Sequence, residues 1–298
     1  MRLLRSYLFV PGTNETLLAK VFKAGADAVV LDLEDAVAES EKARARTGAS
    51  AALLREANAA AGPLTFVRIN SLESTHWRAD VDAVVDRGVA GLRVPKAEDL
   101  ESICRLNDAI GDRERSLGLA PGSIGVTATI ESARGIANIA NIARGPRIRG
   151  FTFGAADFCA DIGADPADDA AVLFARSVLV VASRAARLAP PVASVFTQIN
   201  DDEALRGDTL REKQLGFFGR SAIHPRQIPI IHEAFDPTPD EVGQARRVIA
   251  AHEAAAADGR GAAQTEGAFI DLAVVRRARS ILDLHEAVGK NSRGDNRT

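Results

Sequence analysis

Short apolar runs alternate with amphipathic segments along most of this chain. The runs have the length of strands, whereas the segments between them repeat their apolar residues with the period of a helix. Residues 14–25 show the helical pattern, with Leu17, Leu18, Val21 and Phe22 at helical spacing. The pattern predicts strands at residues 7–12, 28–35, 65–70, 91–97, 124–132, 148–157, 190–200 and 218–225.

Strands that alternate with helices predict a parallel sheet, and eight of them is the number that closes a (β/α)8 TIM barrel. A doubly wound open sheet is the alternative, but it usually has fewer strands and a glycine-rich nucleotide turn. No GxGxxG or GxxxxGK[ST] motif occurs in the chain, which disfavours that alternative without excluding it. We therefore expect an α/β fold with a barrel over residues 1–235, in which the helix at 41–60 is imperfect at Gly48.

The pattern changes after Phe235. Thr238 is followed by Pro239 and Glu241, which is the signature of a capped helix start. We expect a helix to residue 257, a flexible linker at 258–267, a final helix and a polar tail. The final helix is expected to place Val274, Ala278, Ile281 and Leu282 on one face. Residues 236–298 are thus predicted to form a helical extension that packs on the barrel or on a neighbouring subunit.

Composition narrows the class of protein. The chain has 298 residues, 46% of them hydrophobic, and a formal net charge of −3. A charge so near balance gives no electrostatic reason to expect nucleic acid or an anionic membrane as a partner. No run approaches the roughly 20 apolar residues of a membrane span, and no signal peptide is expected. Cys104 and Cys159 are too few for a disulfide framework, which fits a cytoplasmic protein.

Charged residues come late in several predicted strands. The run GADAVVLDLEDAV, residues 25–37, ends a buried strand in Asp32, Glu34 and Asp35. Alternation places Asp32 and Glu34 on one face, and on other strands it brings Arg68 and Glu131 to the late end. The late ends of parallel barrel strands meet at one mouth, where active sites are built. We therefore expect these side chains to share a site.

Carboxylates that gather in this way repel one another unless a cation lies among them. Aspartate and glutamate oxygens without histidine or cysteine suit a hard ion such as Mg²⁺. The alternative is that the three carboxylates after residue 31 only cap the next helix or pair with Lys42 and Arg44. The spacing alone leaves both interpretations open.

Several motifs occur together in one order. They are RSYLFVPG, GADAVVLDLEDAV, KARAR, FVRIN, GLRVPKAE, IES, FTFGAADF and SAIHPRQI. In this combination the chain resembles the citrate lyase β-subunit-like (CitE-like) branch of the HpcH/HpaI aldolase superfamily, over almost its whole length. The resemblance implies a (β/α)8 barrel that uses Mg²⁺. It also implies that Glu131 in TIES and Asp157 in GAAD are the metal ligands.

The resemblance assigns further roles. Arg68 in VRIN would hold a substrate oxygen or carboxylate, because a guanidinium can donate two parallel hydrogen bonds to such a group. The alternative is that Arg68 forms a structural salt bridge to Asp32 or Glu34. The two roles can coexist. Asp32, Glu34 and Asp35 would orient Arg68 and metal-bound waters. Phe9 would lie near the thioester end of the substrate.

Asp271 matches an aspartate that acts as acid/base from a neighbouring subunit in CoA-lyase members, where the motif reads MIDxP. Here Phe269 and Ala273 replace its methionine and proline. The residues alone predict instead that Asp271 caps the final helix. His224 in SAIHP is expected to be structural, and Lys96 to be an ion-pair partner.

The expected activity is a Mg²⁺-dependent carbon–carbon lyase. It would cleave a 3-hydroxyacyl-CoA thioester of the citryl-, malyl- or citramalyl-CoA type to a keto acid and acetyl-CoA, or catalyse the reverse Claisen-type condensation. One alternative is a β subunit of a citrate lyase complex that takes an acyl-carrier-protein thioester. Another is a non-catalytic protein that binds CoA or a keto acid on the same barrel. The resemblance also implies a homo-oligomer, a trimer or hexamer.

Overall fold

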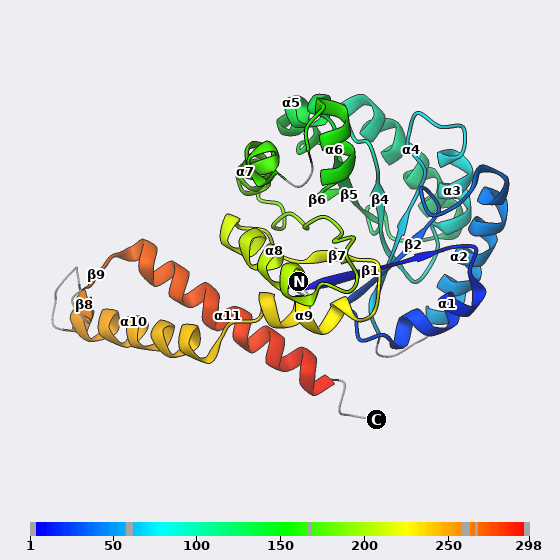
Figure 1. Ribbon diagram of the computed structural model, residues 1–298. Coiled ribbons are helices and arrows are strands. Elements are labelled where there is room, and N and C mark those ends of the chain that lie inside the picture. The colour runs from blue at the N-terminus through cyan, green and yellow to red at the C-terminus, as the bar shows by residue number, and fades with distance from the viewer. Residues whose placement is uncertain (1–3, 58–61, 166–167, 258–262, 266–267, 295–298) are drawn as a thin grey trace. The chain divides into compact units, whose positions relative to one another are not determined.

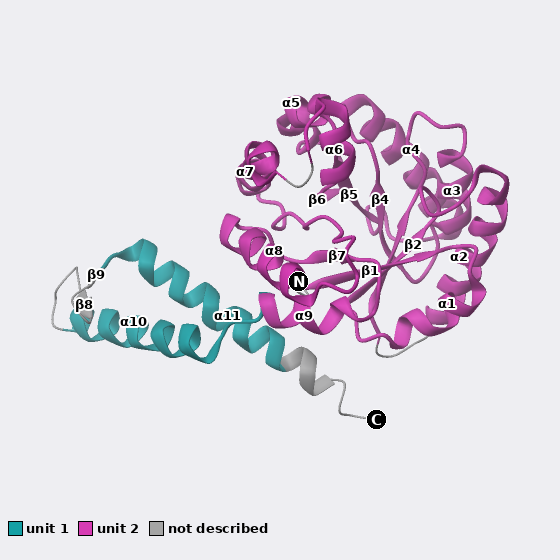
Figure 2. Cartoon of the chain, viewed as in Figure 1, with its two compact units in different colours: residues 1–3, 235–298 teal, residues 4–234 magenta. Residues whose placement is uncertain are grey.

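The structure, a computed structural model, describes residues 4–57, 62–165, 168–257, 263–265 and 268–294. The chain divides into two compact units (Figure 2). Residues 4–234 form the larger unit, and the smaller one is made from Phe235 onward. Among the described residues, no helix is both long and apolar enough to cross a membrane.

The larger unit is built on a parallel sheet of seven strands in the order β6-β5-β4-β3-β2-β1-β7. The strands are β1 (Ser6–Pro11), β2 (Ala28–Asp32), β3 (Leu64–Arg68), β4 (Val89–Val94), β5 (Gly125–Ile130), β6 (Ile148–Phe153) and β7 (Arg220–Ala222). Every neighbouring pair runs parallel. The predicted parallel α/β fold is confirmed as a curled, TIM-barrel-like sheet.

Helices lie on the outer side of the curled sheet (Figure 1). They are α1 (Glu15–Lys20), η1 (Val21–Lys23), η2 (Glu39–Glu41), α2 (Lys42–Glu56), α3 (Trp77–Val84), α4 (Leu100–Leu117), α5 (Ala133–Ile142), α6 (Ala155–Ile162), α7 (Asp169–Ala185), α8 (Asp202–Leu215) and α9 (Gln227–Phe235). The aliphatic core lies between these helices and the sheet. Val29, Leu31, Val67 and Leu92 on the strands are fully buried there.

The strand predicted at 190–200 is wrong. Only Val192 and Ala193 pair, through isolated parallel bridges to Thr152 of β6 and Arg220 of β7. The Ser194 hydroxyl then donates to the Phe153 carbonyl at 2.7 Å and accepts from a backbone amide. Because this side chain takes the place of a backbone ladder, the segment leaves the sheet after two residues.

Helix α2 runs unbroken through Gly48, so the expected imperfection is absent. A Cβ at Gly48 would lie 2.1 Å from the Gly12 carbonyl oxygen, and one at Gly12 would lie 2.8 Å from the Ala45 carbonyl oxygen. The two glycines let the helix approach the loop after β1 closely. Gly48 therefore serves packing rather than a break.

The smaller unit contains α10 (Pro239–Ala257), β8 (Ala263–Thr265), β9 (Ala268–Ile270) and α11 (Leu272–Gly294). The capping box is confirmed, because Glu241 N donates to Thr238 Oγ1 at 3.1 Å and Thr238 N donates to the Glu241 carboxylate at 2.8 Å. Part of the predicted linker is instead strand β8, which pairs antiparallel with β9. The rest of that linker, 258–262 and 266–267, and tail residues 295–298 lie outside the described residues.

The face that α11 buries differs slightly from the predicted one. Ala278 is buried and Ile281 and Leu282 are partly buried, as expected. Val275 is buried, however, and Val274 is 38% exposed. The buried members form one core cluster with α10: Ala245, Val248, Ala255, Ile270, Val275 and Ala278.

A largely buried ion pair between Glu114 and Arg147 lies at the amino ends of the strands, on the side of the sheet away from the cavity. Glu114 of α4 is 1% exposed and accepts from Arg147 Nη1 at 2.8 Å and Nη2 at 2.7 Å. It also accepts from the backbone amides of Gly122 and Ile124 at 2.9 and 3.0 Å. Burial opposes ionisation, but these hydrogen bonds and the Arg147 charge lower the pKa of Glu114 to about 2.

We expect Glu114→Gln to lower the free energy of unfolding by about 3 kcal/mol at pH 7, because it leaves the largely buried guanidinium of Arg147 without its counter-charge. The lowered pKa means that this stabilisation is complete above the unfolded pKa of about 4.3 and is lost as the pH falls toward 2. Urea titrations of both proteins at decreasing pH should show the gap closing. Glu101→Gln, at an exposed position in the first turn of the same helix, should lower stability by no more than about 1 kcal/mol. A gap that did not depend on pH would contradict the assignment.

Candidate active site

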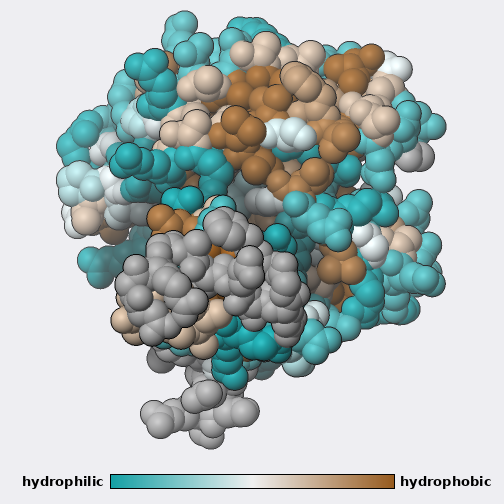
Figure 3. All heavy atoms as spheres, turned by 90° about the vertical axis from the view of Figure 1, so that its left-hand side faces the viewer, coloured by the Kyte–Doolittle hydropathy of each residue, from teal (hydrophilic) through white to brown (hydrophobic). Residues whose placement is uncertain are grey.

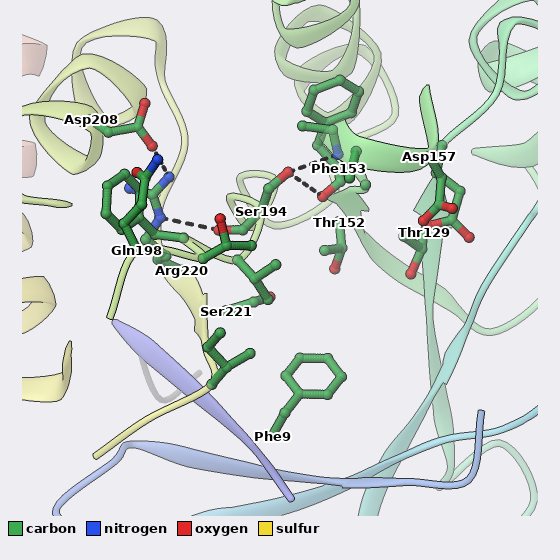
Figure 4. Close-up of a pocket in the computed structure, with 18 of the residues that line it drawn as sticks. Phe9, Thr129, Thr152, Phe153, Asp157, Ser194, Gln198, Asp208, Arg220 and Ser221 are labelled. Carbon is green, nitrogen blue, oxygen red and sulfur yellow. Dashed lines mark hydrogen bonds and ion pairs between the residues drawn. The ribbon is translucent and has the colours of Figure 1, made fainter. Parts of the chain in front are cut away.

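A cavity of about 1280 Å³ lies at the carboxyl ends of the strands. Asp32 and Arg68, the last residues of β2 and β3, line it. Glu131 follows β5, Asp157 lies in the first turn of α6, and both line the same cavity. Figure 4 shows Thr129 and Asp157 on one side of this pocket and Arg220 and Asp208 on the other. The larger unit thus brings the predicted site residues of β2, β3, β5 and α6 together.

The carboxylates after β2 surround one guanidinium. Arg68 Nε and Nη2 donate to the two oxygens of Asp32 at 2.7 and 2.6 Å, which is a bidentate pair. Arg68 Nη1 lies 3.0 Å from Asp35 Oδ2 and 2.9 Å from Glu34 Oε2. The structure therefore shows the salt bridge that the sequence left as one of two roles for Arg68. It also explains why a buried strand ends in three acids.

The ionisation of this group follows from its contacts. Burial by itself would lower the pKa of Arg68, but hydrogen bonds and charge from Asp32, with help from Glu34 and Asp35, raise it. Burial raises the pKa of Glu34 to about 8 against the effect of Arg68. Lys96 Nζ lies 3.9 Å from Glu34, as expected for an ion-pair partner. The cluster keeps Arg68 charged and fixed in one orientation.

Glu131 is held by backbone. The Lys96 amide donates to Glu131 Oε1 at 2.7 Å, and Lys96 adopts a φ of 49°, which is rare for a side-chain-bearing residue. Across the carboxylate, a Cβ added to Gly154 would lie 2.3 Å from Glu131 Oε2. Only glycine fits at that position. One oxygen of Glu131 is therefore held by a backbone hydrogen bond, and the other lies next to the backbone of Gly154.

Glu131 and Asp157 line the same cavity, where Glu131 is buried and Asp157 is exposed. Glu131 is 7% exposed, and burial raises the pKa of its carboxyl to about 7, with a further contribution from the Asp157 charge. The Ser194 hydroxyl accepts from the Ala155 amide at 3.0 Å, which fixes the start of the helix that carries Asp157. A cation would be stabilising here, because burial and the Asp157 charge both oppose ionisation of Glu131.

The donor set fits Mg²⁺. In the described part of the chain, no three or more His, Cys, Asp or Glu form a group that could hold a metal ion. Two carboxylates suffice for Mg²⁺, because it keeps several waters and takes one or two protein carboxylates. Because residue 154 is glycine, no side chain at this position covers Glu131 Oε2. Glu131 and Asp157 are the residues that could hold the ion.

A family model named HpcH/HpaI aldolase/citrate lyase matches residues 5–225. The chain belongs to the HpcH/HpaI aldolase/citrate lyase family. The family recognised from the motifs is thereby confirmed, and membership identifies the chain as a lyase-type enzyme.

Relatives of this HpcH/HpaI family member include the citrate lyase subunit beta of Escherichia coli strain K12. It is 36% identical over 292 residues, which cover 96% of this chain and 94% of the relative. A (3S)-malyl-CoA thioesterase of Cereibacter sphaeroides is 32% identical over 287 residues, covering 95% of each chain. CitE from Mycobacterium tuberculosis, solved with magnesium, acetoacetate and coenzyme A, has a TM-score of 0.78 and 29% identity, covering 95% of this chain and 98% of that one.

Other predicted residues of this family member divide between the two units. Phe9 lines the cavity, and its ring lies 5.1 Å from the Arg68 guanidinium carbon. Asp271 belongs to the smaller unit, where its Oδ1 accepts from the amides of Ala273 and Val274 at 2.8 and 2.9 Å. It is thus the cap of α11 that the residues alone predict. His224 Nδ1 accepts from a nearby backbone amide, that of Arg226, which fits a structural role.

Some cavity residues were not identified from the sequence. They are Arg93, Thr129, Thr152, Ser194 and Ser221, all of which line the pocket. The alternation of side chains along the strands could have identified Arg93. Arg93 on β4 lies opposite Arg68 on β3, so the two side chains are on the same face of the sheet. For Ser194 there was no signal, because its role depends on a segment that does not form the predicted strand.

Proposed function

We propose that this protein is a Mg²⁺-dependent carbon–carbon lyase for a 3-hydroxyacyl-CoA thioester of the citryl-, malyl- or citramalyl-CoA type. The products would be a keto acid and acetyl-CoA, and the reverse reaction would be a Claisen-type condensation. One observation carries the proposal: Glu131, Asp157 and Arg68 come from three different elements and line one cavity. Two acids for a hard cation beside a fixed guanidinium match the needs of keto-acid chemistry.

In this proposal Glu131 and Asp157 hold the ion. Mg²⁺ bound there would polarise the keto oxygen and carboxylate of the keto-acid half. Arg68 supplies fixed positive charge where oxyanion charge develops. Its Nη2 carries a second N–H besides the one given to Asp32, and this N–H would donate to a substrate oxygen. Asp32, Glu34 and Asp35 hold Arg68 and metal-bound waters in position.

We further propose that Asp271 moves the hydroxyl proton as acid/base, from a neighbouring subunit. The position matches the aspartate of the MIDxP motif, and its carboxylate is exposed on the smaller unit. Capping occupies Oδ1, and a carboxylate has a second oxygen that can exchange a proton. This role requires an oligomer, a trimer or hexamer, with residues 236–298 reaching another copy.

Exposed apolar side chains support self-association. Leu173, Phe174 and Val181 of α7 are 49%, 70% and 68% exposed. Hydrophobic side chains also gather in the upper part of the face seen in Figure 3. Patches of this kind mark interaction surfaces more often than scattered apolar residues do.

We also propose that the sheet is a full (β/α)8 TIM barrel over residues 1–235, with Val192 and Ala193 in the place of an eighth strand. Their bridges to β6 and β7 support this, since these are the two edge strands of the seven-stranded order. The short bridging segment is consistent with a barrel whose closure leaves room for the cavity.

Release of keto acid tests the proposed activity. Citryl-, malyl- and citramalyl-CoA should each be incubated with the purified protein in Mg²⁺ and in excess EDTA. We expect keto acid and acetyl-CoA from at least one thioester with Mg²⁺, a loss of at least about 10³-fold with EDTA, and recovery when Mg²⁺ is restored. Absence of metal-dependent turnover with all three would contradict the proposal.

The same assay separates the alternatives. Turnover of an acyl-carrier-protein thioester but not of the CoA thioesters would indicate a subunit of a citrate lyase complex. Release of free CoA without keto acid would indicate a thioesterase, the activity named for the Cereibacter relative. Tight calorimetric binding of CoA or keto acid without any turnover would indicate a non-catalytic binding protein.

A further inference from the structure

Arg93 is a buried guanidinium inside the curled sheet. It is 1% exposed, lies on β4 and lines the cavity. Its Nη1 donates to the Ser221 hydroxyl at 3.0 Å. Its guanidinium carbon lies 4.5 Å from the Tyr7 ring centre and 5.4 Å from that of Phe9. Arg93 is thus fixed by a hydroxyl and two aromatic rings.

Nε and Nη2 of Arg93 are buried, and neither has a hydrogen-bond partner among the described residues. Other buried arginines of this unit are paired with an acid, such as Arg5 with Asp27 and Arg220 with Asp208. An unpaired buried cation is costly unless an anion meets it. Burial lowers the pKa of Arg93 to about 10, which still leaves it charged at neutral pH.

The surroundings of Arg93 suit a carboxylate. Thr152 Oγ1 is buried without a hydrogen-bond partner in the described part of the chain, and Thr152 lines the same cavity. Figure 4 shows Thr152 and Ser221 within the pocket near Phe9. A guanidinium and hydroxyl groups that line one cavity can together recognise a carboxylate.

Arg93 and Arg68 occupy different environments around one ring. Both guanidinium carbons lie within 5.4 Å of the Phe9 ring centre. Arg68 forms ion pairs with three acids of the protein, whereas Arg93 forms no ion pair with an acid among the described residues. Arg93 is level with Thr127 of β5, while Glu131 follows the end of that strand. An anion held by Arg93 would therefore lie deeper along the strands than a metal ion held by Glu131.

We propose that Arg93, with the hydroxyls of Thr152 and Ser221, binds a second carboxylate of the substrate and selects a thioester whose keto-acid half is a dicarboxylate. This inference rests on the proposed lyase function and narrows its substrate class. A citryl thioester carries a carboxymethyl group where a malyl thioester carries hydrogen and a citramalyl thioester carries methyl. Of the three, only the citryl group brings the second carboxylate that Arg93 requires.

Substrate selectivity of Arg93→Met tests the inference. Methionine keeps the length and volume of the buried stem but removes the charge. We expect kcat/KM for the citryl thioester to fall by about 10²-fold or more, because a buried charged hydrogen-bond pair is lost, while values for the malyl and citramalyl thioesters change less than about threefold. Equal losses for all three would show a merely structural role and overturn the inference, as would an unchanged citryl value.

Two further variants serve as controls for this interpretation. Arg93→Lys keeps the charge without the fork, and we expect it to fold and to lose citryl selectivity partially. Arg147→Met removes an arginine that pairs with a buried acid outside the cavity, and we expect reduced stability with the ratio of the kcat/KM values unchanged. A shift of that ratio in Arg147→Met as large as in Arg93→Met would count against Arg93.

Ligand binding separates this inference from the proposed function. Calorimetry with Mg²⁺ should show tighter binding of oxaloacetate than of pyruvate to the wild-type protein, and loss of this difference in Arg93→Met. If no thioester is turned over but the difference depends on Arg93, the lyase function is wrong and the dicarboxylate site stands. If turnover occurs but neither selectivity nor binding responds to Arg93→Met, the function stands and the site is overturned.

Discussion

Glu131→Gln and Asp157→Asn are each expected to lower kcat with the preferred thioester on the order of 10³-fold or more. Loss of a metal ligand removes several kcal/mol of charge stabilisation, and each 1.4 kcal/mol is about tenfold in rate. Glutamine preserves the acceptor for the Lys96 amide and the fit against Gly154, so the Glu131 variant should fold. Steady-state kinetics measures the effect.

Binding of Mn²⁺, followed by electron paramagnetic resonance, gives a readout that does not depend on turnover. We expect weakened binding in both variants. Asp161→Asn is the matched control, because Asp161 lies on the same helix as Asp157 and contacts a backbone amide, that of Ala133, outside the cavity. Normal Mn²⁺ affinity in both site variants would place the ion elsewhere and remove the basis of the proposed activity.

Arg68→Lys is expected to lower kcat/KM by about 10²- to 10³-fold. Lysine provides a point charge but cannot form the bidentate pair with Asp32 and also face Glu34 and Asp35. The charge that stabilises the reacting oxyanion would therefore move, and the acids around it would repel one another more strongly. Kinetics with the preferred thioester, together with thermal unfolding, measures both consequences.

Arg46→Lys is a close control for this substitution. Arg46 pairs with Asp80 at 3.1 Å, and the side chains of Arg46 and Arg68 are both 18% exposed, but only Arg68 lines the cavity. We expect a similar loss of stability in the two variants and a loss of kcat/KM only in Arg68→Lys. If the two variants had equal activity, Arg68 would be a structural ion pair and nothing more.

The candidate site was predictable where chemistry follows strand position. Arg68 and Glu131 are late in their strands, and the parallel topology brings late ends together. The proposed roles of Glu131 and Asp157 as metal ligands came from the resemblance, and the structure adds a shared cavity and an amide that donates to Glu131. How Asp32, Glu34 and Asp35 distribute around Arg68 was not predictable, because it depends on the turn after β2.

Two errors have the same origin. The segment 190–200 has the composition of a strand, but its pairing ends after Ala193 because Ser194 bonds to Phe153 and Ala155. Gly48 looked like a helix defect, but it is a point of contact with Gly12. Both outcomes depend on residues far away in the sequence, which a local pattern does not include.

The sequence by itself determined the alternation of strands and helices, the parallel α/β class and the family. These follow from short-range periodicity and from motifs that keep their order. The tertiary structure decided where the hydrogen-bond ladder of the sheet ends and which acids surround Arg68. It also decided that Arg93 is buried with no acid paired to it among the described residues. Such features arise from packing between strands distant along the chain, and burial makes the free energy of each charge depend on neighbours that local sequence does not specify.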